Sequence, residues 1–506
     1  MLTNYKSGYY MEYYYVMLMK KINRLSIYDL LNFILNESFH IVVNYIGHNI
    51  HSLIMKPKYN RLQPWELEVL ATFFICIKDT QVNYYKTSLQ SLKGFKLLKS
   101  IIKDIKDYDV SLLEPNVNLR IKRAFILMIN NQKNIQEAWY ILSYRNNYFF
   151  NYICNEKKIN IKNFFKDQFK FYYDEIEKKV IDLQILCASE EFRPLAESMM
   201  QKYKEYFDSI TISFDDIQAR QIQEFKENKY EFYYGFKYIS IYPIVTINKK
   251  NEIVLPHLIL NSFLFGTLQK FTYCNKNLRT QMGKVAEDYV YKIFFESDLY
   301  KKNMIIRKLC YGKDNHEAQD LIIETDKGGI FIETKLLTPS AKQRHIEGND
   351  EVFIKRVGEA ILQIYDNITN FTKGLFNPFH HQIAIDNIFG LVVFYQDCFC
   401  DRSDVYNYLR IYRNLNEYEF DYICSHIKFV SLYNLENVVL YNHPLIEEFI
   451  YNRDDKTKWF DYFLINLNIK TNNTSPTLNS FYIHRNNLMD NIRDTIKRLS
   501  DGYDIL

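Results

Sequence analysis

The chain has 506 residues, of which 47% are hydrophobic and 25% are charged, and its formal net charge is +4. This is the composition of a soluble globular protein, and the length predicts two or three domains. A net charge this small for the length permits nucleic-acid binding but does not indicate it, because it produces no strong global field.

The eight cysteines are scattered and form no C-x-x-C pair. This pattern argues against a structural zinc site and favours reduced, buried thiols in a cytoplasmic protein. The first 21 residues lack a clean signal-peptide core, and the sequence has no apolar run of about eighteen residues. We therefore expect a cytoplasmic protein with no membrane-spanning helix.

Residues 1–235 have the mixed apolar periodicity of helices. Ser26 stands at the start of one apolar-periodic run as a capping residue, and Pro64 suits the first turn of another helix. We expect an α-helical N-terminal domain that recognises substrate, senses a trigger, or binds a protein partner or a second copy of the chain. No residue pattern in this half indicates a particular chemistry.

The pattern changes near residue 238, where β-branched and aromatic runs flank the turn-like stretch Asn248–Asn251. Helical and strand-like segments then alternate, which predicts an α/β domain over residues 236–450 and a C-terminal extension over 451–506. The expected segments are helices at 257–271, 282–297 and 352–371, strands at 320–325, 329–335 and 388–395, a strand and helix within 426–440, and a last helix at 486–499.

Charged residues interrupt two apolar strands in QDLIIETDKGGIFIETK, residues 319–335. The stretch Asp326–Gly329 is a reversal signal, so the flanking strands should pair antiparallel and place Asp320 roughly opposite Lys335. Because side chains alternate along a strand, Glu333 and Lys335 share one face. We expect Asp320, Glu333 and Lys335 to converge at one edge of a sheet.

Two convergent carboxylates without a basic partner of their own form a hard-oxygen site suited to Mg²⁺ or Mn²⁺. A lysine beside such an ion should have a lowered pKa, so that it can orient or deprotonate a water molecule. That water would attack phosphorus while the ion stabilises charge on the phosphoryl oxygens. The cluster therefore predicts phosphodiester hydrolysis.

This constellation resembles the PD-(D/E)XK nuclease superfamily. Asp320 is followed after twelve residues by Glu333-Thr334-Lys335, and an upstream helix carries Glu287, preceded by Gly283. The resemblance covers about residues 280–440 and implies a restriction-endonuclease-like mixed sheet flanked by helices. Gln319 stands where the name-giving proline would be, at a position that is variable in the superfamily.

The resemblance also implies roles for individual residues. Asp320 and Glu333 would hold Mg²⁺ or Mn²⁺, with the carbonyl of Thr334 as a third ligand. Lys335 would handle the water. Glu287 would support a metal through water or bind a second ion, and Gln363, on the helix after the E-x-K strand, would occupy the glutamine position of the family.

The same residues also permit purely structural interpretations. The E-x-K triplet also occurs at 156–158, 177–179, 224–226 and 227–229, so it carries no signal by itself. The alternative interpretation of the hairpin at 319–335 is an edge hairpin whose charged side chains face water. The alternative interpretation of Glu287, together with Asp288, is a solvated face of a helix.

Other polar residues near the motif are candidates for contacts with substrate or belong to loops. Lys342 and Arg344 follow the E-x-K strand and are candidates for phosphate contacts, while His316 and His345 are candidates for substrate contact. The pair His380-His381 is interpreted as part of a loop rather than as metal ligands, because no acidic or cysteine partner has a matching spacing.

The sequence thus predicts a Mg²⁺-dependent nuclease, with DNA as the preferred substrate. Restriction or anti-phage defence is the biological setting that this fold suggests by association. The alternative is a catalytically inactive nuclease-fold module that binds nucleic acid or scaffolds a complex.

Overall fold

The structure is a computed structural model of the chain. It describes residues 64–76, 92–111, 138–187, 190–228, 233, 235–273, 276–297, 299–300, 304–307, 309–312, 316–338, 350–396, 402–441, 443–452 and 478–501. Ser26 lies outside these ranges.

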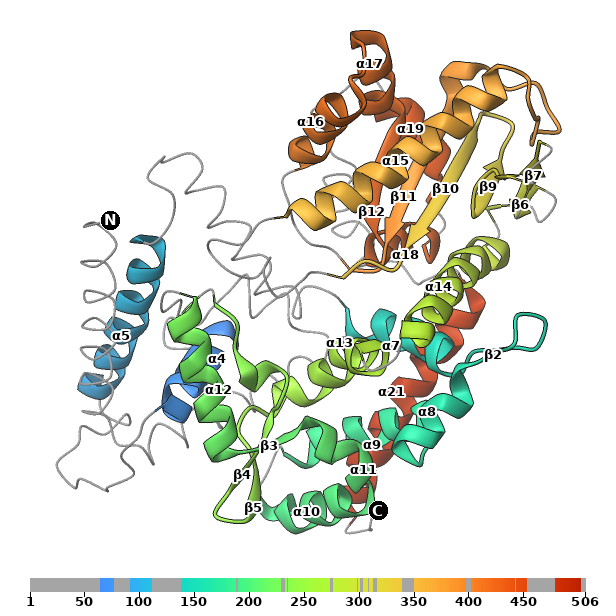
Figure 1. The fold of residues 1–506 in the computed structure, drawn as a ribbon. Helices are drawn as coiled ribbons and strands as arrows, with labels where there is room; N and C mark the ends of the chain where they lie inside the picture. The colour runs from blue at the N-terminus through green and yellow to red at the C-terminus, as the bar shows by residue number, and fades with distance from the viewer. Residues whose placement is uncertain are drawn as a thin grey trace.

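A five-stranded mixed sheet has the strand order β12-β11-β10-β9-β6 (Figure 1). β10, β11 and β12 run parallel, and β9 is antiparallel to both β10 and β6. The fold is therefore of the mixed α/β class, as expected. Its strands are β6 (Ile305–Arg307), β9 (Leu321–Glu324), β10 (Gly329–Lys335), β11 (Ile388–Phe394) and β12 (Ile427–Ser431).

Helices cover both faces of this sheet. Ile330 and Ile332 of β10 are buried toward α14 and α18, whereas Phe331 is buried toward α15 and α16. Strands covered on both faces read as continuous apolar runs, which is why β11 has the sequence IFGLVVF. The flanking helices are α14 (Lys276–Glu296), α15 (Glu351–Thr372), α16 (Arg402–Arg413), α17 (Glu417–His426), α18 (Leu432–Val439) and α19 (Leu445–Asn452).

α15 lies close against the sheet at Gly390 of β11. A β-carbon at this position would clash with the side chain of Ile364 on α15 and would also press on Ile427 of β12. Glycine therefore permits the close approach of helix and strand. This contact fixes the part of α15 that carries Asn367, one turn after Ile364.

The part of the chain that precedes α14, called the helical part below, is mainly helical, and α4 begins at Pro64. Its helices are α4 (Pro64–Cys76), α5 (Leu92–Ser111), α7 (Trp139–Phe150), α8 (Ile161–Phe169), α9 (Tyr173–Leu186), α10 (Arg193–Lys202), α11 (Lys204–Phe207), α12 (Phe214–Glu227) and α13 (His257–Tyr273). It also contains short strands that were not expected, namely β1 (Ile153–Cys154), β2 (Ile159–Asn160) and β3 (Thr211–Ser213).

The hairpin expected around residue 249 is confirmed as β4 (Ile244–Ile247) and β5 (Lys250–Ile253). Asn248 and Lys249 have φ angles of 51° and 66°. Two consecutive left-handed residues are typical of the two-residue turn that matches strand twist. β3 pairs parallel with β4 and extends this hairpin to a three-stranded sheet.

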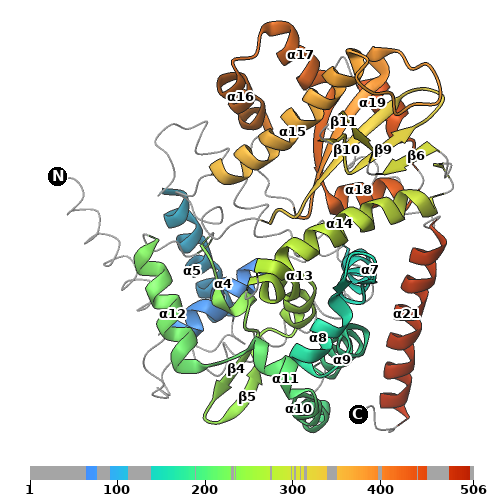
Figure 2. The same ribbon diagram turned by 45° about the vertical axis from the view of Figure 1, so that its right-hand side comes forward.

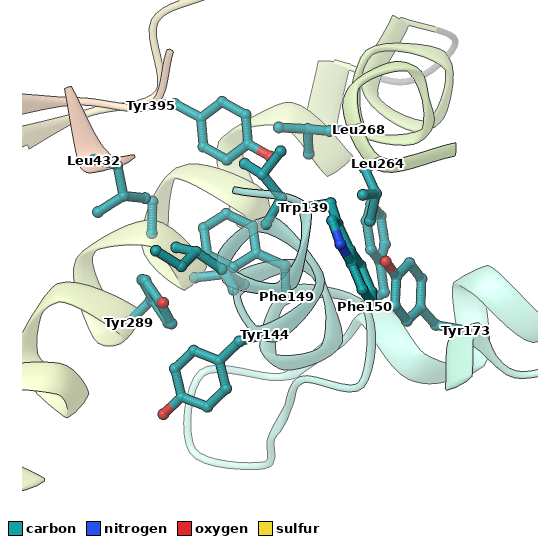
Figure 3. Close-up of a cluster of buried hydrophobic side chains, with 14 of the residues drawn as sticks. Trp139, Tyr144, Phe149, Phe150, Tyr173, Leu264, Leu268, Tyr289, Tyr395 and Leu432 are labelled. Carbon is teal, nitrogen blue, oxygen red and sulfur yellow. The ribbon is translucent and has the colours of Figure 1, made fainter. Parts of the chain in front are cut away.

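One buried cluster joins the helical part to the five-stranded sheet. Trp139, Phe149 and Phe150 of α7 pack in the same core as Tyr289 of α14 and Tyr395, which follows β11 (Figure 3). Figures 1 and 2 both show α14 between the sheet and the helical part. The expected domain division at residue 235 stays a prediction, and this core extends across it.

The C-terminal helix α21 (Asn479–Ser500) returns to the helical part, and Figure 2 shows it running along that side. Phe481 is buried in the shared core. The hydroxyl groups of Ser480 and Tyr144 lie 2.7 Å apart, and Thr495 Oγ1 donates to Asp182 Oδ1 at 2.8 Å. Helix α21 therefore packs on helices from the opposite end of the sequence.

The cysteines of the described ranges form no disulfide bond with one another. Cys76 is buried, as expected, whereas Cys310 is exposed. Among the helices of these ranges, none is long and apolar enough to cross a bilayer.

A buried ion pair fastens α7 to α18, and its removal should destabilise the protein. Arg145 Nε and Nη2 donate to the two carboxylate oxygens of Glu436 at 2.9 and 2.5 Å, and both side chains are almost fully buried. Arg145→Met should lower the free energy of unfolding by about 3–5 kcal/mol, because Glu436 would keep an uncompensated buried charge. Urea unfolding followed by circular dichroism measures the change.

Two comparisons test this explanation. Arg145→Met combined with Glu436→Gln should be more stable than Arg145→Met alone, because glutamine removes the charge and still accepts from Tyr289. The exposed pair of Arg493 and Asp490 supplies the control, since Arg493→Met should change stability by less than about 1 kcal/mol. A double variant no more stable than the single one would show that the buried charge is not the cause.

Candidate active site

The expected hairpin at 319–335 is present as β9 and β10. Gly329 pairs with Glu324 and Ile332 with Leu321, so the same register places Glu333 opposite Asp320. The sequence-based pairing of Asp320 with Lys335 is wrong by two residues, because the turn starts at Thr325, whose N–H donates to Gly328 O at 2.9 Å. A shift of two residues preserves the faces of a strand, so Asp320, Glu333 and Lys335 still come together.

Asp320 lies at the start of β9, half-buried, and Thr334 N–H donates to its Oδ2 at 2.7 Å. Burial, together with the nearby carboxylates of Glu333 and Glu287, raises the pKa of Asp320 to about 8, against the opposing effects of the Thr334 N–H and the Lys335 ammonium. A carboxyl group with this pKa holds a proton near neutral pH. Three acidic side chains are therefore close enough to disfavour one another's ionisation.

Glu333 is 3% exposed, and both of its carboxylate oxygens have partners. Lys335 Nζ contacts Oε1, and Gln319 Nε2 contacts Oε2. The sequence-based expectation of carboxylates without a basic partner is therefore wrong for Glu333. About a third of the Lys335 side chain is exposed (34%), so its ammonium lies between the buried carboxylate and solvent.

A chain of buried amides fixes Gln319. Asn367 on α15 donates through Nδ2 to Gln319 Oε1 at 3.0 Å and also contacts Ala318 O. Tyr311 OH donates to Asn367 Oδ1 at 2.9 Å, and Asn370 Nδ2 donates to Tyr311 OH at 2.8 Å. Tyr311 belongs to β7 (Cys310–Tyr311), which pairs with β8 (His316–Glu317). Gln319 thus orients Glu333.

Gln363 does not take part in this chain. It is exposed on α15, and Asn367 occupies the inward-facing position one turn later. The helical periodicity contained the signal for this correction: Asn367 follows Ile361 and Ile364 on the buried face of α15, whereas Gln363 does not. A polar residue on an apolar helix face is the pattern that identifies such a position.

Glu287 is half-buried on α14 and lies near enough to Asp320 to raise its pKa. Asp288, the next residue, is 7% exposed and forms ion pairs with Lys157 and Arg307. The interpretation of both residues as a solvated helix face is therefore wrong for Asp288. The structure brings Glu287, Asp320, Glu333 and Lys335 together.

Several sequence-based candidates lie outside what the structure describes. Lys342, Arg344 and His345 fall in the stretch 339–349, which is outside the described ranges. His316 belongs to β8, but its side chain is not among those described. Their expected contacts with substrate stay predictions.

A second polar cluster lies at the opposite end of β9. Glu324 is fully buried, and its carboxylate accepts from the backbone N–H groups of His380 and His381 and contacts Nδ1 of both rings at 2.9 and 2.8 Å. Burial alone would raise the pKa of Glu324, but these contacts hold it at about 2. The histidine pair is therefore part of a loop anchored by Glu324.

The formal charge of the site near Asp320 matches that of one divalent cation. Glu287, Asp320 and Glu333 with Lys335 would carry a formal charge of −2 when all four are ionised. Across the described residues, no three His, Cys, Asp or Glu side chains form a ready-made metal cage. Mg²⁺ does not require one, because it uses one or two protein carboxylates and takes its other ligands from water and phosphate. Asp320 and Glu333 are the residues that would hold it.

Comparison with known proteins adds no relative. No family model, no curated protein and no solved structure matches this chain.

Because the pKa of Asp320 is raised, the free energy of unfolding should depend on pH when no divalent ion is present. The folded protein binds this proton more tightly than the unfolded chain, whose carboxyl has the ordinary pKa of 3.8. The stabilisation is therefore complete below pH 3.8 and is lost as the pH rises through about 8. In EDTA, the free energy of unfolding of wild type should fall relative to that of Asp320→Asn as the pH rises from 5 to 8.5. Denaturant titrations at both pH values measure this, and a pH-independent difference would contradict the raised pKa.

Asn367 and Gln363 provide a matched pair on one helix. Asn367→Leu should lower the free energy of unfolding by about 1–3 kcal/mol, because Gln319, Ala318 and Tyr311 lose a buried partner. Gln363→Leu should change it by less than about 0.5 kcal/mol, since this side chain is exposed. Chemical denaturation of both variants checks the assignment, and equal effects would refute it.

Proposed function

We propose that this protein is a Mg²⁺-dependent nuclease that hydrolyses phosphodiester bonds, with DNA as its preferred substrate. One observation carries the proposal: Asp320 and Glu333 meet at the ends of two buried strands, with Glu287 and Lys335 beside them. Such a concentration of carboxylates is costly in a protein interior unless it has a cationic ligand. Strongly perturbed acidic groups of this kind cluster at functional sites.

The order of elements supports the finer assignment to a restriction-endonuclease-like fold. Helix α14 carries Glu287, β9 follows Asp320, β10 carries Glu333 and Lys335, and α15 follows. This is the order that the resemblance to the PD-(D/E)XK superfamily implies. Parallel pairing of β10 with β11 places the E-x-K strand inside the sheet rather than at its edge, which argues against a solvated edge hairpin.

The chain's own groups have separable tasks in this proposal. Asp320 and Glu333 bind the ion, while Gln319 and the Thr334 N–H hold one oxygen of each carboxylate in place. A bound Mg²⁺ would supply charge stabilisation at the phosphoryl oxygens. Lys335, which is partly exposed beside Glu333, can orient a water molecule as an ammonium, or accept the proton of that water as a neutral amine. Glu287 adds negative charge that favours a divalent ion.

A second function has one observation in its favour. Both oxygens of Glu333 have protein partners, Lys335 and Gln319. A site that stays closed in this way would be a catalytically inactive module that binds nucleic acid or scaffolds a complex. The nuclease requires Lys335 to release Oε1, which is feasible because the ammonium borders solvent.

The wider setting is also proposed. No disulfide bond joins the cysteines of the described ranges, which favours a reducing, cytoplasmic location. The helical part then recognises substrate, senses a trigger or binds a protein partner. A role in restriction or anti-phage defence follows from the association of this fold with such systems.

A cleavage assay with matched variants tests the nuclease. Purified protein is incubated with supercoiled plasmid, linear DNA and single-stranded RNA, each with Mg²⁺, Mn²⁺ or EDTA. Lys335→Met should slow metal-dependent cleavage about 100-fold or more, because proton handling at the water is lost. Glu333→Gln should abolish it by weakening metal binding.

Lys226→Met supplies the control, because Lys226 lies in another E-x-K triplet on α12, far from the cluster in sequence. It should cleave like wild type. Cleavage unaffected by Glu333→Gln and Lys335→Met would overturn the proposal. Nucleic-acid binding without cleavage by wild type under every metal condition would support the inactive module, and faster cleavage of RNA than of DNA would correct the substrate.

A further inference from the structure

We propose that the helical part positions the candidate metal site by gripping Asp288, the neighbour of Glu287 on α14. Lys157 and Tyr152 form the grip from the β1–β2 hairpin region, and Arg307 forms it from β6. The inference rests on the proposed function, since it concerns how Glu287 is aimed at Asp320. Two of these positioning residues, Tyr152 and Lys157, lie outside the stretch 280–440 that the family resemblance covers, whereas Arg307 lies within it.

The contacts on Asp288 come from both parts of the chain. Lys157 Nζ lies 2.6 Å from each carboxylate oxygen, Tyr152 OH donates to Oδ2, and Arg307 Nη2 donates to Oδ1. The Arg307 guanidinium also lies 4.3 Å from the ring centre of Tyr291, one turn further along α14. Arg307 is opposite Leu321 in the sheet, next to Asp320. The grip therefore adjoins the candidate site.

A second polar contact holds the following residue. Tyr289 OH donates to Glu436 Oε1 at 2.7 Å, and Glu436 is the buried partner of Arg145 on α7. Directly after Glu287, Asp288 is therefore bonded to Lys157 of the helical part, whereas Tyr289 is bonded to Glu436 of α18 and packs against Phe149 of α7. These contacts link positions 131–147 residues apart in sequence.

The physical effect of the grip is to fix the rotation of α14 about its own axis. Consecutive helix positions differ by about 100°, so Asp288 faces the hairpin while Glu287 faces Asp320. A carboxylate about 6 Å from the helix axis moves by about 1 Å for a rotation of 10°. Displacements of this size are enough to weaken a catalytic site considerably. Releasing Asp288 should therefore misplace Glu287 without unfolding the protein.

The hairpin that carries Lys157 is short and locally ordered. Ile153 pairs with Asn160 and Cys154 with Ile159, and Lys158 N–H donates to Asn155 O at 3.1 Å across the turn. Lys158 is exposed and adopts a left-handed φ of 53°. Two adjacent lysines therefore share one turn, and Lys157 is the one whose ammonium contacts Asp288 of α14, which gives a matched pair for mutation.

The test measures Mn²⁺ binding to the full-length protein by electron paramagnetic resonance, together with the thermal unfolding midpoint of each variant. Lys157→Met should weaken the Mn²⁺ affinity about tenfold, as loss of a supporting partner does at metal sites. Lys157→Arg should restore most of the affinity, because arginine can still donate to Asp288. Lys158→Asn should leave it unchanged, and asparagine tolerates the left-handed backbone.

The outcomes separate the two proposals. If wild type binds no Mn²⁺, or if Asp320→Asn does not weaken binding, the proposed function is overturned, and this inference with it. If wild type binds and Asp320→Asn abolishes binding, but Lys157→Met matches Lys158→Asn, the positioning role alone is overturned. A lower unfolding midpoint with unchanged Mn²⁺ affinity would show that the grip on Asp288 serves stability only.

Discussion

Burying Asp320 beside Glu333 is electrostatically unfavourable, and the surrounding structure is built around this constraint. The Thr334 N–H, Gln319 and Lys335 each contact one of the two carboxylates, and a proton on Asp320 removes part of the remaining charge. Each contact reduces the cost, but none supplies two positive charges. A divalent cation would, which is why we propose one as the ligand of this site.

The site depends on elements far outside the E-x-K hairpin. Asn367 on α15 fixes Gln319, and through it Glu333. On the other face of the sheet, α14 carries Glu287 and contacts the helical part through the ion pair of Asp288 with Lys157 and the packing of Tyr289 on Phe149. The buried core that contains Trp139 and Tyr289 connects the same elements (Figure 3). Helical part and sheet therefore act together in placing the charged groups.

Local patterns predicted much of this region from the sequence. The glycines and the apolar runs gave the β9–β10 hairpin, and the spacing of Asp320, Glu333 and Lys335 gave their convergence. The register was wrong by two residues because residues that favour a turn do not specify which of them closes it. Asn367 was missed in favour of Gln363, although its place on the apolar face of α15 was readable. The contact of Lys157 with Asp288 and the pair of Arg145 with Glu436 were not predictable, because the partners lie more than a hundred residues apart.

The most direct test of the central claim is a crystal structure of the protein grown with Mn²⁺, with the ion located by its anomalous scattering. We predict a peak at about 2.0–2.2 Å from carboxylate oxygens of both Asp320 and Glu333, with the Lys335 ammonium moved away from Oε1 of Glu333. The account would be contradicted by well-ordered carboxylates with no peak between them and Lys335 still bound to Glu333.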